Sequence, residues 1–278
     1  MQEAPVYIFA ALPCEAKPLI AYFKLKKETS ISPFAIYRRD SLTLTVSGVG
    51  KSAMAAAVAY TSALFPANSL AVMLNIGVAG HKSHELGALF AAEKITDQDS
   101  NKSYYPQLVV NLPCLTQGIT TVSQPQLHYK TESLYDMEAS AFYEAAIRFS
   151  SSELIQSLKV ISDNENNEIE QITPAKVSVW LEKQLNVIDT CIKKLQALAN
   201  EHKVLELNEY PEIIQQWRLS SNERLQLKRL LSRWEVLSNG KALDLKRQQD
   251  LTGKQFLVYL QKRISEQGFG GFNLVDSK

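Results

Sequence analysis

Three carboxylic acids occupy positions where the sequence predicts that strands end or helices begin. Glu15 follows an apolar run by a few residues, Glu138 falls in the first turn of an expected helix, and Asp163 directly ends another apolar run. Ligands of open α/β sheets bind just beyond the carboxyl ends of strands. Taken singly, each acid could be an ordinary helix-start or turn residue. Together they predict acid–base chemistry at one edge of a sheet.

The elements that must position these acids alternate in type along residues 5–200. Short apolar, β-rich runs alternate with helical stretches, which is typical of an α/β layer fold. Strands are expected at 6–12, 41–46, 70–76, 89–95, 119–122 and 158–162. Helices are expected at 15–23, at 51–64, from about 136, and from Pro174 to about 199.

Two further local patterns bear on these acids. The stretch 77–80 (GVAG) predicts a small-residue loop after the third strand, whose backbone can approach a ligand closely. Ser133 and Asp136 form a helix start signal. The helix that follows repeats apolar residues at Met137, Ala141, Ala145 and Phe149, with Phe142 flanking them.

Five short stretches occur in an order that resembles the purine nucleoside phosphorylase and methylthioadenosine/S-adenosylhomocysteine nucleosidase superfamily. They are the first strand with Glu15 after it, 47–51 (SGVGK), 75–80 (NIGVAG), 137–139 (MEA) and 162–163 (SD). The resemblance covers roughly residues 5–200. It implies a three-layer α/β/α catalytic domain with a mixed central sheet at 1–200. Beyond residue 200 the composition changes to few β-rich runs and many Leu, Gln, Arg, Lys and Glu residues, which predicts an α-helical extension at 201–278.

The resemblance also implies cleavage of the N-glycosidic bond of a purine nucleoside or a 5′-modified adenosine. Asp163 would be the general acid for the base, Glu15 the general base for water, and Glu138 would hold the ribose hydroxyls. Proton transfer of this kind accelerates a reaction roughly 10²–10⁴-fold. Further substrate contacts are expected from Gly48, Val78, Ala79, Gly80 and Met137.

The acceptor of the sugar is expected to be water. Phosphorylases of the superfamily bind phosphate with a glycine-rich first turn and with arginines, whereas the turn at 12–15 (LPCE) has neither, and 72–80 has no arginine. A glutamate in that turn would repel phosphate. A phosphate-dependent phosphorylase remains the first alternative.

A catalytically degenerate nucleoside-binding or partner-docking protein is the second alternative. Val78 stands where the nucleosidases usually have a serine, and the segment from there to Glu138 is short. That segment normally supplies an aromatic residue that stacks on the base. The candidates for this role are Tyr104, Tyr105, Leu127 and His128.

Composition limits the class of protein. The 278 residues are 45% hydrophobic and 21% charged, with a formal net charge of +1, which indicates a globular protein that binds neither nucleic acid nor a membrane surface. Three dispersed cysteines, no expected signal peptide and no long apolar run indicate a cytoplasmic protein. No metal or organic cofactor is implied, and the resemblance implies a homodimer or larger homo-oligomer.

Several other features have more ordinary interpretations. His81 and His84 could suggest a metal site, but an exposed loop is favoured; Cys14 is expected to be a buried small residue. Helices are expected at 211–219, 221–237 and 253–265, with a stop at 239–240 and a loose tail from 268. Trp217 and Trp234 fit core or docking residues. The basic residues Arg218, Arg224, Lys228, Arg229 and Arg233 fit a solvated helix face.

Overall fold

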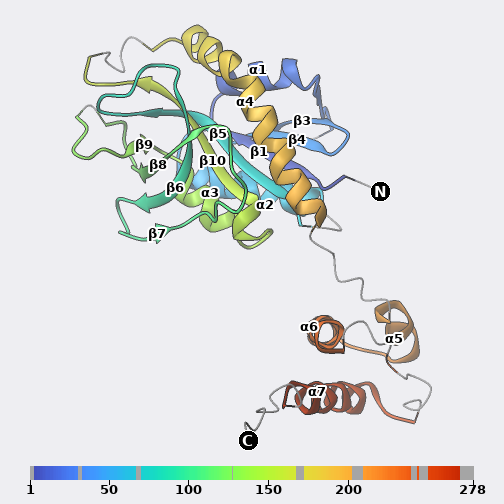
Figure 1. The fold of residues 1–278 in the computed structure, drawn as a ribbon. Helices are drawn as coiled ribbons and strands as arrows, with labels where there is room; N and C mark the ends of the chain where they lie inside the picture. The colour runs from blue at the N-terminus through green and yellow to red at the C-terminus, as the bar shows by residue number, and fades with distance from the viewer. Residues whose placement is uncertain are drawn as a thin grey trace, which may run out of the picture. The chain divides into compact units, whose positions relative to one another are not determined.

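The chain divides into two compact units, Met1–His202 and Lys203–Lys278. The structure, a computed structural model, describes residues 3–30, 33–66, 70–126, 128–166, 172–201, 209–238, 243 and 250–269. The first unit is α/β and the second is helical (Figure 1). Each unit has hydrophobic clusters of its own.

One mixed sheet forms the centre of the first unit. Its strands are β1 (Val6–Ala10), β2 (Lys26–Lys27), β3 (Ala35–Arg39), β4 (Leu42–Val46), β5 (Val72–Gly80), β6 (Leu89–Asp97), β7 (Ser103–Tyr104), β8 (Leu115–Thr121), β9 (Leu134–Asp136) and β10 (Ile155–Asp163). In space the order is β10, β6, β8, β9, β5, β1, β4, β3 and β2, with β7 beside β6. β10 also pairs with β5, so β5, β10, β6, β8 and β9 close into a ring. β5 is parallel to β1 and β10 and antiparallel to β9, which makes the sheet mixed.

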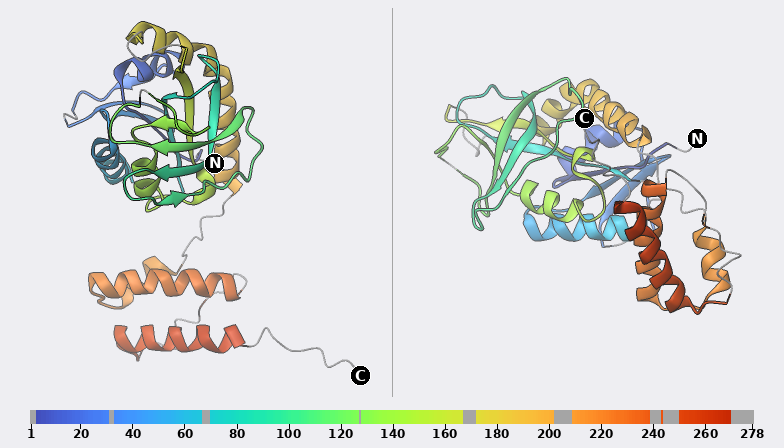
Figure 2. Two further views of the ribbon diagram at one scale, coloured as in Figure 1. Left: turned by 90° about the vertical axis from the view of Figure 1, so that its left-hand side faces the viewer. Right: turned by 60° about the horizontal axis from the view of Figure 1, so that its bottom comes forward.

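Helices cover both faces of this sheet. They are α1 (Pro13–Tyr22), α2 (Lys51–Leu64), α3 (Ala139–Ala146) and α4 (Pro174–Glu201), and a 3₁₀ turn, η1, spans Ser152–Leu154. α1 packs beside α4 on one face and α2 beside α3 on the other (Figures 1 and 2). The expected three-layer α/β/α arrangement with a mixed sheet is therefore confirmed.

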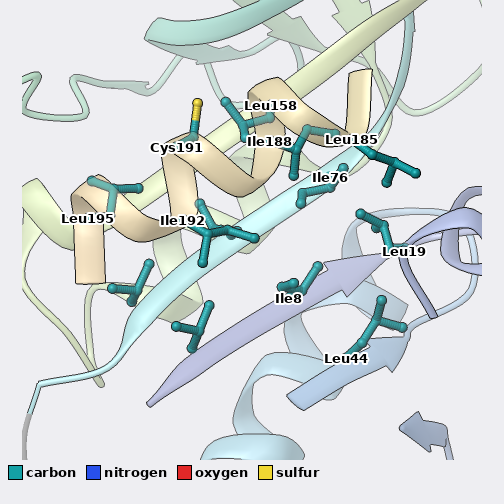
Figure 3. Packing of buried hydrophobic residues seen from close by; sticks show 14 of the residues in the cluster. Ile8, Leu19, Leu44, Ile76, Leu158, Leu185, Ile188, Cys191, Ile192 and Leu195 are labelled. Carbon is teal, nitrogen blue, oxygen red and sulfur yellow. The ribbon is translucent and has the colours of Figure 1, made fainter. Parts of the chain in front are cut away.

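The long helix α4 is held to the sheet by an apolar stripe. Pro174 begins the helix, where its missing N–H costs nothing. Leu185, Ile188 and Ile192 recur at helical spacing and pack with Ile76 of β5 and Leu158 of β10 (Figure 3). This packing covers the two strands whose carboxyl ends carry the candidate site.

The strand β5 continues to Gly80, although the glycines at 77 and 80 predict that it ends at residue 76. The prediction of a loop at 77–80 is wrong, because Val78 pairs with Val160 and Ala79 pairs with Ile161 of β10. Strands β2, β3, β7 and β9 were not expected. The small residues 77–80 therefore present strand backbone, not loop backbone, to their surroundings.

The helix α3 begins later than its expected start signal. Ser133 precedes the helix and Asp136 ends β9. The carboxylate of Asp136 accepts the N–H groups of Glu138 and Ala139, so Glu138 becomes the residue before the helix instead of part of its first turn. The predicted apolar face at Met137, Ala141, Ala145 and Phe149 is also wrong. The buried residues of the helix are Ala139, Ser140, Phe142, Tyr143 and Ala146.

The second unit consists of α5 (Tyr210–Gln216), α6 (Ser221–Ser238) and α7 (Gly253–Phe269). Trp217 and Trp234 are both buried in its core, and the ring of Trp217 stacks on Phe256 with centroids 4.3 Å apart. The five basic side chains named above are exposed, as a solvated face requires. The stop at 239–240 and the tail beyond 269 lie outside the described residues. No described helix is long and apolar enough to cross a membrane.

Replacing Trp217 should destabilise the helical unit. Trp217→Ala removes the stacked ring and the hydrogen bond from its Nε1–H to the carbonyl of Leu251. The expected loss is about 3–5 kcal/mol in the free energy of unfolding. Hydrogen exchange of the amides in α5, α6 and α7 measures it. Leu225→Ala, at a side chain that is 52% exposed, is the control and should have little effect. Equal effects of the two changes would contradict the assigned core.

Candidate active site

A cavity of about 270 Å³ lies at the carboxyl ends of β1, β5 and β10. This is close to the lower end of the range for small-molecule sites, roughly 300–1,000 Å³. Its walls come from six parts of the first unit. The lining residues are Ala11, Leu12, Glu15, Val49, Val78, Ala79, Gly80, Val122, Pro125, Gln126, Tyr129, Tyr135, Asp136, Met137, Glu138, Ser162, Asp163, Ile172 and Val177.

Glu15 lines the cavity from the first turn of α1. Its side chain is buried, and its carboxylate accepts the N–H of Leu12 at 2.8 Å and the N–H of Val78 at 2.9 Å. A methyl group on Gly77 would lie 2.7 Å from Oε1 of Glu15, so a larger residue there would force the carboxylate to move. Burial raises the pKa of Glu15, while the ammonium of Lys159 acts to lower it.

Glu138 enters the cavity from the residue before α3. It is buried, and Oε1 accepts the N–H of Gly50 at 2.7 Å. Burial raises the pKa of Glu138 to about 7; the Asp136 carboxylate acts in the same direction and the Lys159 ammonium against it. Glu138 can therefore change its charge near neutral pH.

Lys159 is one residue beside this cavity that sequence reasoning missed. It lies within the apolar strand β10 and its side chain is 1% exposed, with Nζ 2.9 Å from Oδ2 of Asp136, which is also buried. The ammonium interacts with the charges of Glu138 and Glu15 as well. One buried cation thus faces three carboxylates. A charged residue inside an otherwise apolar run was the available signal.

Asp163 ends β10 and lines the same cavity. Its Oδ1 accepts the hydroxyl of Ser162 and its Oδ2 accepts the hydroxyl of Tyr129. Its backbone carbonyl accepts the N–H of His81 at 3.0 Å. These contacts fix the carboxyl group at the end of the strand.

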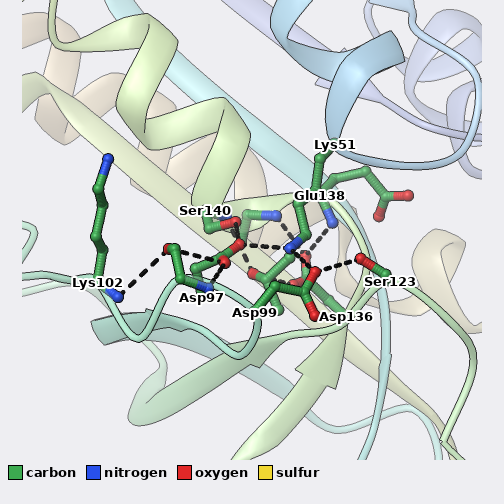
Figure 4. Close-up of polar contacts among 11 residues, drawn as sticks. Lys51, Asp97, Asp99, Lys102, Ser123, Asp136, Glu138 and Ser140 are labelled. Atoms are coloured by element: carbon green, nitrogen blue, oxygen red, sulfur yellow. Dashed lines mark hydrogen bonds and ion pairs between the residues drawn. The ribbon is translucent and has the colours of Figure 1, made fainter.

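A polar network holds the start of α3, and therefore Glu138, in place (Figure 4). Lys51, at the start of α2, lies 2.6 Å from Asp97 and 2.7 Å from Asp99. Asp97 also accepts the hydroxyl of Ser140 at 2.7 Å. Although burial acts against it, these donors hold the pKa of Asp97 well below its usual range. The network joins β6, α2 and α3 beside the cavity.

Besides Glu138, five residues were expected to contact substrate, and four of these five line the cavity. Val78, Ala79, Gly80 and Met137 are in its wall. Gly48 is not; its φ of +84° shapes the turn that brings its neighbour Val49 to the wall instead. The turn also presents the N–H of Gly50 to Glu138.

The aromatic wall differs from the expectation. Tyr104 packs against Tyr143, Tyr105 is 62% exposed, and His128 is exposed; none of these three lines the cavity. Leu127 lies outside the described residues. Tyr129 and Tyr135 form the aromatic wall instead, with ring centroids 5.3 Å apart. Sequence spacing alone gave no reason to choose them.

The remaining polar candidates are His81, His84 and Cys14. The expected exposure of the 81–85 loop is wrong for His81, which is 1% exposed and stacks on His84 with centroids 3.8 Å apart. Among the residues that the structure describes, no group of three potential ligands could hold a metal ion. Cys14 is half-buried, and burial raises the pKa of its thiol, which favours the unreactive protonated form.

Lys159→Met should destabilise the first unit strongly, because it leaves the buried carboxylate of Asp136 without its cation. The expected loss is about 3–5 kcal/mol in the free energy of unfolding. The matched control is Lys193→Met, which removes a lysine 2.7 Å from Asp189 but 71% exposed, and should cost at most about 1 kcal/mol. Urea denaturation measures both. Similar losses for the two variants would show that Lys159 is not a buried counter-charge.

Comparison with known proteins places this fold. No family model and no curated protein sequence matches the chain. Among solved structures it is similar to the Arabidopsis thaliana 5′-methylthioadenosine nucleosidase, with a TM-score of 0.57 and 14% identity over 70% of this chain and 97% of that one. It is equally similar to the Helicobacter pylori futalosine hydrolase, with a TM-score of 0.57 and 14% identity over 69% and 98%.

A third solved structure contains a nucleoside. It is a point mutant of the Helicobacter pylori nucleosidase with 5′-methylthioadenosine in its active site, with a TM-score of 0.55 and 14% identity over 68% of this chain and 99% of that one. The helices beyond residue 202 fall outside the fold that these structures share. The α/β unit of this chain thus has the fold of these methylthioadenosine nucleosidases and of the futalosine hydrolase.

Proposed function

We propose that the chain hydrolyses the N-glycosidic bond of a purine nucleoside or a 5′-modified adenosine. One observation carries this proposal. Glu15, Glu138 and Asp163 come from parts of the chain far apart in sequence, and all three line the same cavity at the carboxyl ends of parallel strands. A set of buried carboxylates with different partners can divide the roles of acid, base and cation stabiliser.

The chemistry requires such a division. Breaking the bond leaves positive charge on the ribose and negative charge on the departing base. A carboxylate at Glu138 accepts the ribose hydroxyls and stabilises the cationic sugar, because charges interact strongly in a site that excludes water. Asp163 donates a proton to the base, and Glu15 orients and deprotonates the attacking water.

The lining of the cavity favours water over phosphate as the acceptor. Among the described residues that line it, none is an arginine or a lysine. Lys159 lies nearby but its charge is taken by Asp136, Glu138 and Glu15. A phosphate dianion beside these carboxylates would be repelled.

Release of free base tests this proposal. Adenosine, inosine, methylthioadenosine and S-adenosylhomocysteine are incubated with the protein, with and without phosphate, and the products are separated by chromatography. We expect base release without phosphate. Strict dependence on phosphate would favour a phosphorylase. A thermal shift with nucleoside but no turnover would favour a binding protein that does not catalyse.

Asp163→Asn should reduce base release by at least about 10²-fold while the chain stays folded, because the amide cannot supply the proton. Asp40→Asn is the control, since Asp40 pairs with the neighbouring Arg39 and its side chain is 79% exposed. Initial rates and circular dichroism are measured on both. A fully active Asp163→Asn protein would reject the assigned acid.

Nucleoside affinity should increase with pH through the ionisation of Glu138. The raised pKa of Glu138, about 7, means that the neutral acid predominates below that pH and the carboxylate above it. Only the carboxylate accepts hydrogen bonds from both ribose hydroxyls. Adenosine binding to the Asp163→Asn variant, which should turn the nucleoside over at least about 10²-fold more slowly, is measured by calorimetry and should therefore be about tenfold weaker at pH 6 than at pH 8. Affinity that is constant across this range would contradict the role of Glu138.

We also propose that the chain assembles into homodimers or larger homo-oligomers. Light scattering of the full chain measures the state directly. All of the residues to which we assign a role in the reaction belong to the α/β unit.

A further inference from the structure

Tyr129 contacts the proposed general acid from a wall of the cavity. Its side chain is 7% exposed and its hydroxyl donates to Oδ2 of Asp163. The ring packs in a small apolar cluster with Val122, Tyr135 and Met137, all of which line the cavity. The phenol is therefore fixed by its ring and aimed at the acid by its hydroxyl.

The chain leaves space for this contact at Gly80. A methyl group added there would lie 2.7 Å from Cζ of Tyr129 and 2.6 Å from Oδ2 of Asp163. Both distances are too short for a carbon side chain, so any residue larger than glycine would push the two groups apart. The glycine at the end of β5 is thus needed where the tyrosine meets the acid.

Each carboxylate oxygen of Asp163 accepts a hydrogen bond from one hydroxyl group. Ser162 donates to Oδ1 and Tyr129 donates to Oδ2. Burial, together with the neighbouring Asp163, raises the pKa of Tyr129, so the phenol keeps its proton and acts as a donor. A carboxylate has about four acceptor positions. The two hydroxyls therefore orient the group and still leave positions free for a ligand in the cavity.

We propose that Tyr129 is a positioning residue for Asp163, an inference that rests on the proposed function. When the base departs, the O–H bond of Asp163 breaks, an N–H bond forms on the base, and the electron pair of the glycosidic bond moves into the base. Asp163 becomes a carboxylate in this step. Hydrogen bonds to the ionised form favour it, so the hydroxyl of Tyr129 stabilises the carboxylate that this step leaves on Asp163.

Tyr129→Phe tests this role, because it keeps the ring and removes only the hydroxyl. The carboxyl carbon of Asp163 is followed by ¹³C NMR as a function of pH. We expect its titration midpoint to move upward by about one pH unit on loss of a hydrogen bond to a charged group. The alkaline limb of the pH–rate profile should move in the same direction. kcat should fall about tenfold, with a smaller change in KM.

Tyr135→Phe is the matched control. Tyr135 belongs to the same wall, but its hydroxyl pairs with Thr131 instead of Asp163. Removing the hydroxyl of Tyr135 should leave the titration midpoint of Asp163 unchanged. A second variant, with 3,5-difluorotyrosine at position 129, has a more acidic phenol and donates more strongly. It should move the midpoint of Asp163 downward, opposite to Tyr129→Phe.

The outcomes separate this inference from the proposed function. An unchanged midpoint of Asp163 in Tyr129→Phe, or equal shifts in Tyr129→Phe and Tyr135→Phe, would overturn the role of Tyr129. The titration needs no turnover. If the midpoint moves as expected but the unaltered protein releases no base, the proposed function fails and the effect of Tyr129 on Asp163 is established.

Discussion

A buried ammonium group, that of Lys159, faces three buried carboxylates in the centre of the α/β unit. Charges removed from water are tolerated only when they are paired, and Lys159 pairs directly with Asp136. Glu15 and Glu138 share the same cation at longer range, so negative charge is in excess. Burial raises the pKa values of Glu15 and Glu138, and for Glu138 the carboxylates of Asp136 and Glu15 act in the same direction. The site can therefore hold a proton near neutral pH and favours positive charge on a bound ligand.

The fold brings these groups together through strand ends and backbone N–H groups. β5 and β10 run parallel, and their carboxyl ends meet at the cavity. Glu15 is aimed by the N–H of Val78, and Glu138 by the N–H of Gly50. Asp136 connects the ion pair to α3, because it binds Lys159 and also accepts the first N–H groups of the helix. Position and charge in this site are thus controlled by the same few contacts.

Much of the layer architecture could be predicted because it depends on local patterns. The helix at 51–64 and the helix from Pro174 follow from propensity and from apolar spacing, and both are confirmed. The end of β5 could not be read this way, because the glycines at 77 and 80 indicate a loop unless the partner strand is known. The start of α3 was misplaced for a similar reason. Asp136, which was expected at the start of the helix, is the last residue of β9, and this strand could not be recognised without its partner strands.

The site was predictable where strand ends carry acidic side chains, and less so elsewhere. The three carboxylates follow from their positions after strands and before a helix. Lys159 was read as part of an apolar run, although a charged residue there requires a buried partner. Tyr129 depends on tertiary packing above Gly80, for which no sequence pattern exists. The sequence alone therefore did not predict the contacts between segments that are distant along the chain.

The central claim is that a water molecule replaces the base on the sugar. The most direct measurement is incubation of methylthioadenosine with the full chain in H₂¹⁸O without phosphate, followed by mass spectrometry of a rapidly quenched sugar product. The account predicts release of adenine and enzyme-dependent incorporation of one ¹⁸O atom at C1 of the sugar, above the slow exchange of the free sugar in a control without protein. Release that occurs only with phosphate, or no release of base from any nucleoside tested, would contradict it.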